Sequence, residues 1–209
     1  MILVPRGPEY DAVRRGCAGT AAATSILAVP AGSAAASALE GAAGSSFVIL
    51  GLCGALDPAL HVGDVIACAG AIFGSESLAF DAALTAHVGE ATGARRGGHA
   101  LTLDRIVTAR AERAALYRET GAAVVEMEGF HLAQRLAGQG CTVAMVRIVS
   151  DDASYDLPDI SGAIDADGRL RPLALLAAFA RAPQRALRFI GESRRALAAL
   201  EATARSISR

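Results

Sequence analysis

The sequence predicts an α/β fold, a three-layer sandwich with a central mixed twisted sheet, formed by residues 1–209 as one domain. Two observations predict it. A continuous apolar run at residues 47–50, and a run at 142–149 that is nearly all apolar except Arg147, are typical of strands buried on both faces, and segments of helical pattern separate such runs. The length of 209 residues also suits one domain with a sizeable core. Neither a linker nor an internal repeat interrupts the chain.

Each element follows from local pattern and from Gly or Pro at its boundaries. Pro8 suits a first helical position, where its missing N–H costs nothing, and Gly121 suits a helix C-terminus. The predicted strands are 2–4, 25–29, 47–50, 65–73, 100–107, 122–125 and 142–149. The predicted helices are 9–15, 32–41, 80–88, 110–119, 128–139, 172–182 and one that begins at Pro183. A tight turn is expected at 165–169.

Composition excludes several functional classes. The net charge is −1 and the charged residues form no basic stripe, which argues against nucleic-acid binding. The four cysteines are scattered without CxxC spacing, so we expect no zinc or redox site, no metal, and a reducing, cytoplasmic location. We expect no signal peptide and no transmembrane segment. No GxGxxG follows the first strand, which disfavours a hydride-transfer enzyme with a nicotinamide cofactor, and we expect no cofactor.

Acidic residues follow two apolar strands. Glu126, Met127 and Glu128 stand where one strand turns into a helix, and Ser150 and Asp151 end the next strand. Ligand sites in open α/β sheets lie beyond the carboxyl ends of strands, so these residues form a candidate site. In the alternative interpretation, the two glutamates only favour the first turn of a helix through its dipole.

Two further charged residues stand at informative places. Arg147 lies inside an apolar strand and therefore needs a carboxylate partner, which Asp151 or Glu126 could supply. Glu9 stands at a strand-to-helix junction, where an acid is also favourable for the helix dipole alone. Two adjacent arginines at 95–96 lie in a Gly-rich turn, where solvation is the simpler interpretation.

Glu126-Met127-Glu128, followed by Arg147-x-x-Ser150-Asp151, resembles the purine nucleoside phosphorylase and nucleosidase superfamily, which includes the methylthioadenosine/S-adenosylhomocysteine nucleosidases. The Gly-rich segment 51–56 and the Val-Gly-Asp-Val segment at 62–65 extend the resemblance, which covers most of the chain. It implies cleavage of the N-glycosidic bond of a purine nucleoside, with adenine as the base.

The resemblance also implies roles for single residues. Asp151 is expected to be the general acid that donates to purine N7, held protonated by a water-poor pocket or by neighbouring acids. Glu128 would accept from the ribose hydroxyls, Met127 would pack on the sugar, and Glu9 would activate water. The remaining expected substrate-binding residues are Glu126, which could pair with Arg147, together with Ser150, Cys53, Gly54 and Arg147.

Phosphate-dependent members of the superfamily hold phosphate with an Arg and a Ser at this Gly-rich loop. Leu52 replaces the Ser and Ile49 stands where the Arg is expected, so hydrolysis is favoured. Phosphorolysis stays open, because Arg6, with Arg95 or Arg96, could supply the missing charge. A non-catalytic nucleoside-binding protein also stays open.

The tail carries a narrower resemblance. Leu157-Pro158, Asp165-x-Asp167-Gly168-Arg169, and Ala182-Pro183-Gln184 are similar to the hopanoid-associated phosphorylase subgroup, which is linked to removing adenine from a nucleoside on a hydrophobic polycycle. The superfamily resemblance further implies a homo-oligomer, with a dimer as the simplest closed form.

Overall fold

The computed structural model describes residues 1–39, 44–159 and 179–209. Within these ranges, ten strands form one mixed sheet in the order β6-β5-β8-β9-β3-β10-β4-β7, and β1 pairs with β2 and β3 beside this path. The strands are β1 (Ile2–Pro5), β2 (Ile26–Val29), β3 (Ser46–Ala55), β4 (Val65–Cys68), β5 (Gly70–Phe73), β6 (Glu76–Ala79), β7 (Arg95–Arg96), β8 (His99–Thr102), β9 (Val124–Glu126) and β10 (Thr142–Asp151). The mixed α/β sheet predicted from the sequence is confirmed.

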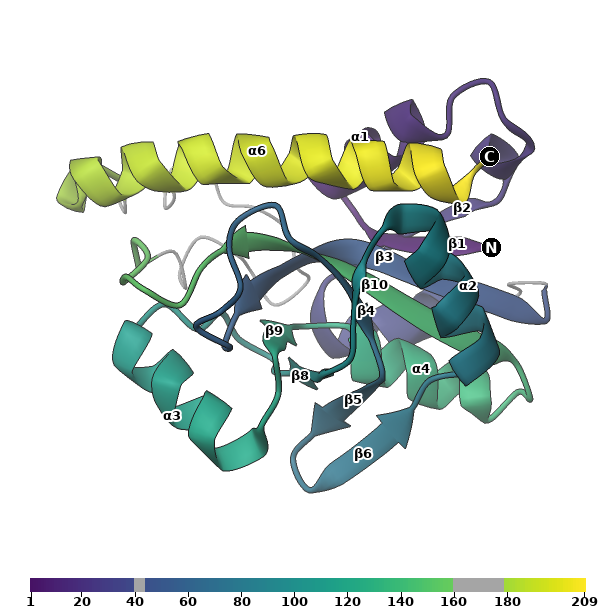
Figure 1. Ribbon diagram of the computed structural model, residues 1–209, viewed down its shortest axis with the longest axis horizontal. Helices are drawn as coiled ribbons and strands as arrows, with labels where there is room; N and C mark the ends of the chain where they lie inside the picture. The colour runs from purple at the N-terminus through teal and green to yellow at the C-terminus, as the bar shows by residue number, and fades with distance from the viewer. Residues whose placement is uncertain (40–43, 160–178) are drawn as a thin grey trace.

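Helices cover both faces of this sheet (Figure 1). One face carries α1 (Pro8–Gly16), α2 (Ala82–Thr92) and the long α6 (Pro183–Ile207), which packs against both α1 and β10. The other face carries α4 (Gly129–Ala137) and the 3-10 helix η2 (Gly32–Leu39), while α3 (Arg110–Thr120) packs beside β8 and β9. A further short 3-10 helix, η1, spans Ala21–Thr24.

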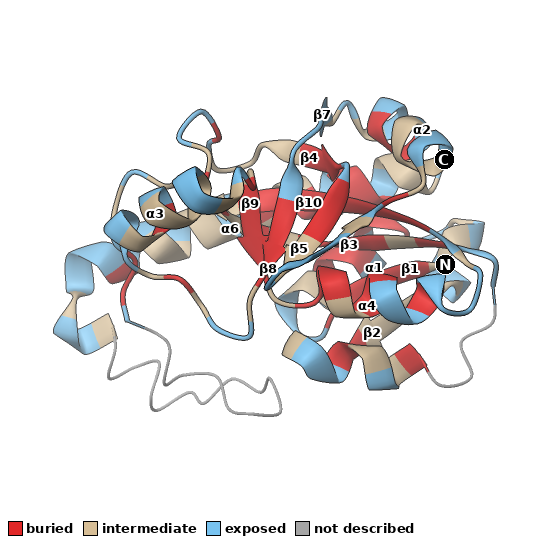
Figure 2. Cartoon of the chain, turned by 90° about the horizontal axis from the view of Figure 1, so that it is seen from below, coloured by how far each residue is buried: buried red, intermediate tan, exposed pale blue. Residues whose placement is uncertain are grey.

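The two faces of β10 show why this sequence forms a central strand. Ala144, Val146 and Ile148 pack with the α1 and α6 side, whereas Met145 and Val149 pack with the α4 side. Successive side chains point to opposite faces of a strand, so both sets are buried at once. Figure 2 shows the buried residues concentrated in the strands and on the inner sides of the helices.

Local signals account for several helix boundaries. Gly7 adopts a φ of 91° before Pro8, which occupies the first turn of α1. Asp81 caps α2 by accepting a hydrogen bond of 2.7 Å from the Leu84 N–H. Gly121 ends α3 in the left-handed conformation, as the sequence predicts.

Some predicted elements differ in extent. The strand predicted over 65–73 is two strands, β4 and β5, and the strand predicted over 100–107 ends at Thr102. The hairpin strand β6 was not predicted because residues 76–79 are mostly exposed and carry little apolar periodicity. The basic turn at 95–96 is instead a two-residue edge strand, β7. The turn predicted at 165–169 lies outside the described residues. The helix predicted over 172–182 also begins outside them.

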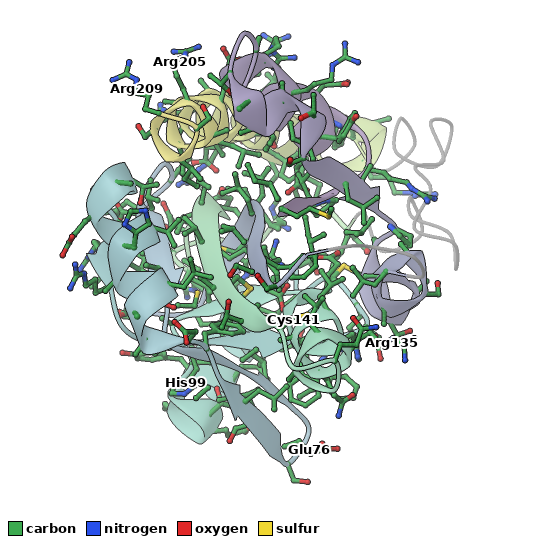
Figure 3. The ribbon with its side chains drawn as sticks, turned by 90° about the vertical axis from the view of Figure 1, so that its right-hand side faces the viewer. Glu76, His99, Arg135, Cys141, Arg205 and Arg209 are labelled. Atoms are coloured by element: carbon green, nitrogen blue, oxygen red, sulfur yellow. The ribbon has the colours of Figure 1, made fainter. Side chains whose placement is uncertain are left out.

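Several charged side chains lie at the periphery of the fold. Figure 3 shows Arg205 and Arg209 near the end of α6, and Glu76 on the β5–β6 hairpin, all pointing away from the body of the protein. No helix among the described residues has the length and apolar character that crossing a membrane requires.

Candidate active site

A cavity of about 240 Å³ lies where α1, the second half of β3, the end of β9 and the end of β10 converge. Its outer wall comes from the loop after β8, from Leu157 and from Phe189 and Ser193 of α6. The parallel strands β3 and β10 bring their carboxyl ends to one edge of the sheet. β9 instead runs antiparallel to β3, with Val125 paired to Gly54, so its carboxyl end lies beside the interior of β3. The site therefore forms across β3 rather than between two adjacent strand ends.

Arg147 and Glu126 form a buried ion pair behind the cavity. Register explains the meeting, because Arg147 is paired with Gly51 of β3, and that residue leaves room for the guanidinium. Glu126 also accepts hydrogen bonds from the Thr102 hydroxyl and from the N–H groups of Glu128 and Gly129, at 3.0 and 2.7 Å for the two amides. Of the two partners that the sequence offered for Arg147, the structure selects Glu126.

Glu128 lines the cavity, with one carboxylate oxygen 3.4 Å from a nitrogen of Arg147 and the other 3.4 Å from the N–H of Gly32. Its side chain is buried. Burial raises the pKa of Glu128 to about 8, against the lowering effect of Arg147. Glu128 therefore keeps a proton near neutral pH, and its carboxyl group can both donate and accept a hydrogen bond.

Glu9 reaches the cavity from the first turn of α1. Its carboxylate accepts a 2.6 Å hydrogen bond from the N–H of Leu52, and burial raises the pKa of Glu9 despite this bond. A Cβ placed on Gly51 would lie 2.7 Å from the Glu9 carboxylate and 2.5 Å from Arg147. The absence of a side chain at position 51 therefore lets the carboxylate and the guanidinium approach the same point of β3.

Asp151 lies on the opposite side of the cavity, buried at the end of β10. The Ser150 hydroxyl donates to one of its oxygens at 2.5 Å, and the guanidinium of Arg113 forms an ion pair with the other. The burial of Asp151 shields it from solvent. The charged group in contact with Asp151, however, is a cation from α3 rather than the neighbouring acid that was offered as the alternative.

Met127, Cys53 and Gly54 also line the cavity, as the resemblance implied. A Cβ on Gly54 would lie 3.0 Å from an Asp151 oxygen, so Gly54 gives Asp151 its space. The Cys53 thiol is buried, and this burial raises its pKa well above the ordinary value. Cys53 is consequently a neutral thiol that contributes packing.

Neither the two loop positions that hold phosphate in relatives nor the candidate substitute arginines provide a phosphate site in this cavity. Ile49 is buried in the core, and Leu52 presents an apolar side chain to the cavity while its N–H is bonded to Glu9. Arg6 is exposed, and it does not line the cavity. Arg95 pairs with Asp64 and Arg96 with Glu90, both away from the site.

The sequence analysis missed Arg113 and Thr102. A signal for Arg113 existed, because it stands three residues before Leu116 on the same helical face, and an arginine on an inward face needs an acid. Thr102 is the residue of β8 opposite Glu126 in the parallel register, which sequence alone does not give. Among the described residues, no His, Cys, Asp and Glu gather in a group that could hold a metal ion.

Sequence comparison decides the family. A profile described as the phosphorylase superfamily matches residues 12–181. The chain belongs to the phosphorylase superfamily. Membership identifies it as an enzyme that cleaves the glycosidic bond of a nucleoside. No curated protein matches the chain in sequence.

Solved structures share the superfamily fold. The 5'-methylthioadenosine/S-adenosylhomocysteine nucleosidase of Neisseria meningitidis, in complex with methylthio-immucillin-A, is 15% identical with a TM-score of 0.67, over 98% of each chain. The corresponding Helicobacter pylori nucleosidase is 14% identical with a TM-score of 0.66, over 97% of this chain and 95% of that one. The futalosine hydrolase of Helicobacter pylori is 14% identical with a TM-score of 0.63, over 92% and 95%. At these identities the likeness establishes the fold.

Proposed function

We propose that this enzyme hydrolyses the N-glycosidic bond of a purine nucleoside, with adenine as the leaving base. The observation that carries the proposal is the distribution of acids around one cavity, with Asp151 on one side and Glu9 and Glu128 on the other. Breaking this bond leaves positive charge on the sugar and negative charge on the base. The reaction therefore needs a proton donor at the base and acceptors at the sugar.

The roles follow from this placement. The electron pair of the C1′–N9 bond moves to the purine as that bond breaks, and Asp151 gives its proton to purine N7. Glu128 holds the ribose hydroxyls, and Met127 packs on the sugar. Water attacks C1′ and gives its proton to Glu9, whose raised pKa makes it a better base near neutral pH than an ordinary glutamate. Ser150 orients Asp151 through their hydrogen bond.

Charge supports water rather than phosphate as the nucleophile. Four acids line the cavity, Glu9, Glu126, Glu128 and Asp151, against Arg105 and Arg113. Arg113 is paired with Asp151, and Arg105 is exposed and paired with Glu112. As an ionised base, the Glu9 carboxylate would repel an inorganic phosphate anion, whereas water would meet a base.

The group at the ribose C5′ is proposed to be apolar. Ile106, Val107, Leu157 and Phe189 form an apolar part of the cavity wall, which suits such a group. A hopanoid-linked adenosine is consistent with this wall and with the tail motifs of the sequence. The motif at 165–169 lies outside the described residues, so the support for this substrate comes from the sequence resemblance and the wall.

The test is a panel of adenosine, methylthioadenosine and inosine, assayed for free base with and without millimolar phosphate. We expect free adenine and free sugar without phosphate, and no appreciable acceleration when phosphate is added. A requirement for phosphate together with a ribose 1-phosphate product would establish phosphorolysis instead, with Arg6 the first candidate for the phosphate site. No release of base from any nucleoside would favour a non-catalytic binding protein.

A further inference from the structure

Arg113 is a fully buried arginine that reaches the candidate active site from α3, with 1% of its surface exposed. Its Nε and Nη2 donate to the carbonyl oxygen of Val107 at 3.1 and 2.8 Å, and its Nη1 donates to the carbonyl oxygen of Asp152 at 3.2 Å. Nη2 also forms the ion pair with Asp151. Every nitrogen of the guanidinium therefore has an acceptor.

These contacts join two walls of the cavity. Val107 belongs to the loop after β8, Asp151 ends β10, and Asp152 follows it. A planar guanidinium with a fixed arrangement of donors is suited to hold such acceptors at defined positions. The two backbone carbonyls anchor Arg113, so the direction in which it holds the Asp151 carboxylate is fixed by the protein backbone.

We propose that Arg113 is the positioning residue of Asp151: it holds Oδ1 of the carboxyl group, so that Oδ2, which also bonds Ser150, is the oxygen that serves the purine. The proposal rests on the proposed function, because it assigns Asp151 to the base. Arg113 itself lines the cavity wall, but its donors are directed at the protein.

The position of Gly54 supports this division of the carboxyl oxygens. A Cβ at residue 54 would lie 3.0 Å from Oδ1 of Asp151 and 3.5 Å from Nη2 of Arg113. A side chain there would press on the ion pair, and glycine leaves the pair undisturbed. The same carboxyl group has its other oxygen 2.5 Å from the Ser150 hydroxyl oxygen, which also lies 3.0 Å from the Cys53 carbonyl oxygen. The two oxygens therefore have separate neighbours, with Arg113 in an ion pair at Oδ1 and Ser150 at Oδ2.

The test compares Arg113→Met and Arg113→Lys with the wild type in steady-state base release. We expect Arg113→Met to lower kcat by about tenfold to a hundredfold with KM changed less than about threefold, because orientation of the acid matters more in the transition state than in binding. Lysine keeps the charge but lacks the planar arrangement of donors. The kcat of Arg113→Lys should therefore exceed that of Arg113→Met by less than about threefold. Arg118→Gln, an exposed arginine of the same helix, is the matched control and should leave kcat unchanged.

A double-mutant cycle with Asp151→Asn separates positioning from a purely structural role. If Arg113 acts through Asp151, the double variant Arg113→Met/Asp151→Asn should release base within about threefold of Asp151→Asn alone. Independent losses that multiply would contradict the proposal, and so would full rescue by lysine. Failure of both Arg113 variants to fold, judged by circular dichroism, would show that the pair serves the fold and would also overturn it.

Failure of this inference is distinguishable from failure of the proposed function. A wild type that releases no base contradicts the hydrolase assignment. An active wild type together with a folded Arg113→Met variant of unchanged kcat contradicts only the positioning role.

Discussion

Individual acids in this site differ in their surroundings although all of them are near one another. Glu126 is neutralised by Arg147 and bonded by two backbone amides, so it serves as an anchor for the turn into α4. Glu128 is buried and Glu9 is half-buried, both with less compensation, and desolvation raises the pKa of both. Asp151 has its own cation in Arg113. Such differences in environment let acids of the same type take different roles in one reaction.

Asp151→Asn is expected to lower kcat for base release by roughly a hundredfold or more, in the range typical of general acid catalysis. The amide keeps the shape of the carboxyl group but cannot give up a proton to N7, so KM should change much less. Steady-state kinetics on an adenine nucleoside measure both values. Asp11→Asn, on the exposed side of α1, is the control. A kcat within a few-fold of the wild type would remove Asp151 from the acid role.

The residues of the site were largely readable from the sequence, because their chemistry is carried by short motifs at strand ends. Glu126, Met127, Glu128, Ser150 and Asp151 all line the cavity that the structure shows. Their individual roles stay predictions. Arg113 and the contact of Thr102 with Glu126 depend on helix and strand placement, which no local pattern specifies.

At the scale of elements, β3 makes room for the site because two of its residues, Gly51 and Gly54, have no side chain. Gly51 and Gly54 stand on the strand between the acids of β9 and those of β10, and each leaves space that a side chain would fill. The sequence analysis interpreted these glycines as part of a Gly-rich loop that resembles the one holding phosphate in phosphate-dependent members of the superfamily. The structure adds that charged side chains of the protein occupy part of that space.

Gly51→Ala is therefore expected to reduce both stability and activity. Its Cβ would lie 2.5 Å from Arg147 and 3.1 Å from Pro5, and overpacking of this kind costs about 1–3 kcal/mol. Gly191→Ala is the matched control, because nothing lies within 4 Å of a Cβ there and α6 should gain about 0.5–1 kcal/mol. Chemical denaturation measures both. Equal stability changes in the two variants would contradict this account of β3.

The limits of sequence reading also appear at this scale. Strands form at 47–50 and 142–149 as predicted from their apolar runs, but β3 continues to Ala55 through the Gly-rich segment that was expected to be a loop. The direction of β9 relative to β3 could not be predicted, because strand polarity in a mixed sheet depends on connections and not on composition. The short edge strands β6 and β7 are mostly exposed, so hydrophobic periodicity gives little sign of them.

At the scale of the whole molecule, the three-layer arrangement buries a group of acids beside one arginine. Glu9, Glu126 and Glu128 surround Arg147 on the α4 side of the sheet, and one positive charge cannot balance three ionised carboxylates. Protons held by the folded protein reduce this imbalance. Homo-oligomerisation, which the resemblance implied, stays a prediction.

This arrangement makes the stability of the protein depend on pH. Burial raises the pKa of Glu128 to about 8 from its ordinary value of 4.5, and the unfolded chain has the ordinary value. Between these two values the folded state holds more protons than the unfolded state, so the free energy of unfolding decreases as pH rises. The stabilisation is complete below pH 4.5 and is lost as pH rises through about 8, with a slope of at most about 1.4 kcal/mol per pH unit.

Glu128→Gln should flatten this dependence, because glutamine resembles the protonated carboxyl group and does not ionise. The melting temperature of the variant minus that of the wild type should therefore increase as pH rises from 5 to about 8. Thermal unfolding across this range measures the difference, and Glu119→Gln on the exposed side of α3 is the control. A difference that stays constant with pH would show that Glu128 is ionised throughout. The carboxyl group would then meet the ribose only as an acceptor.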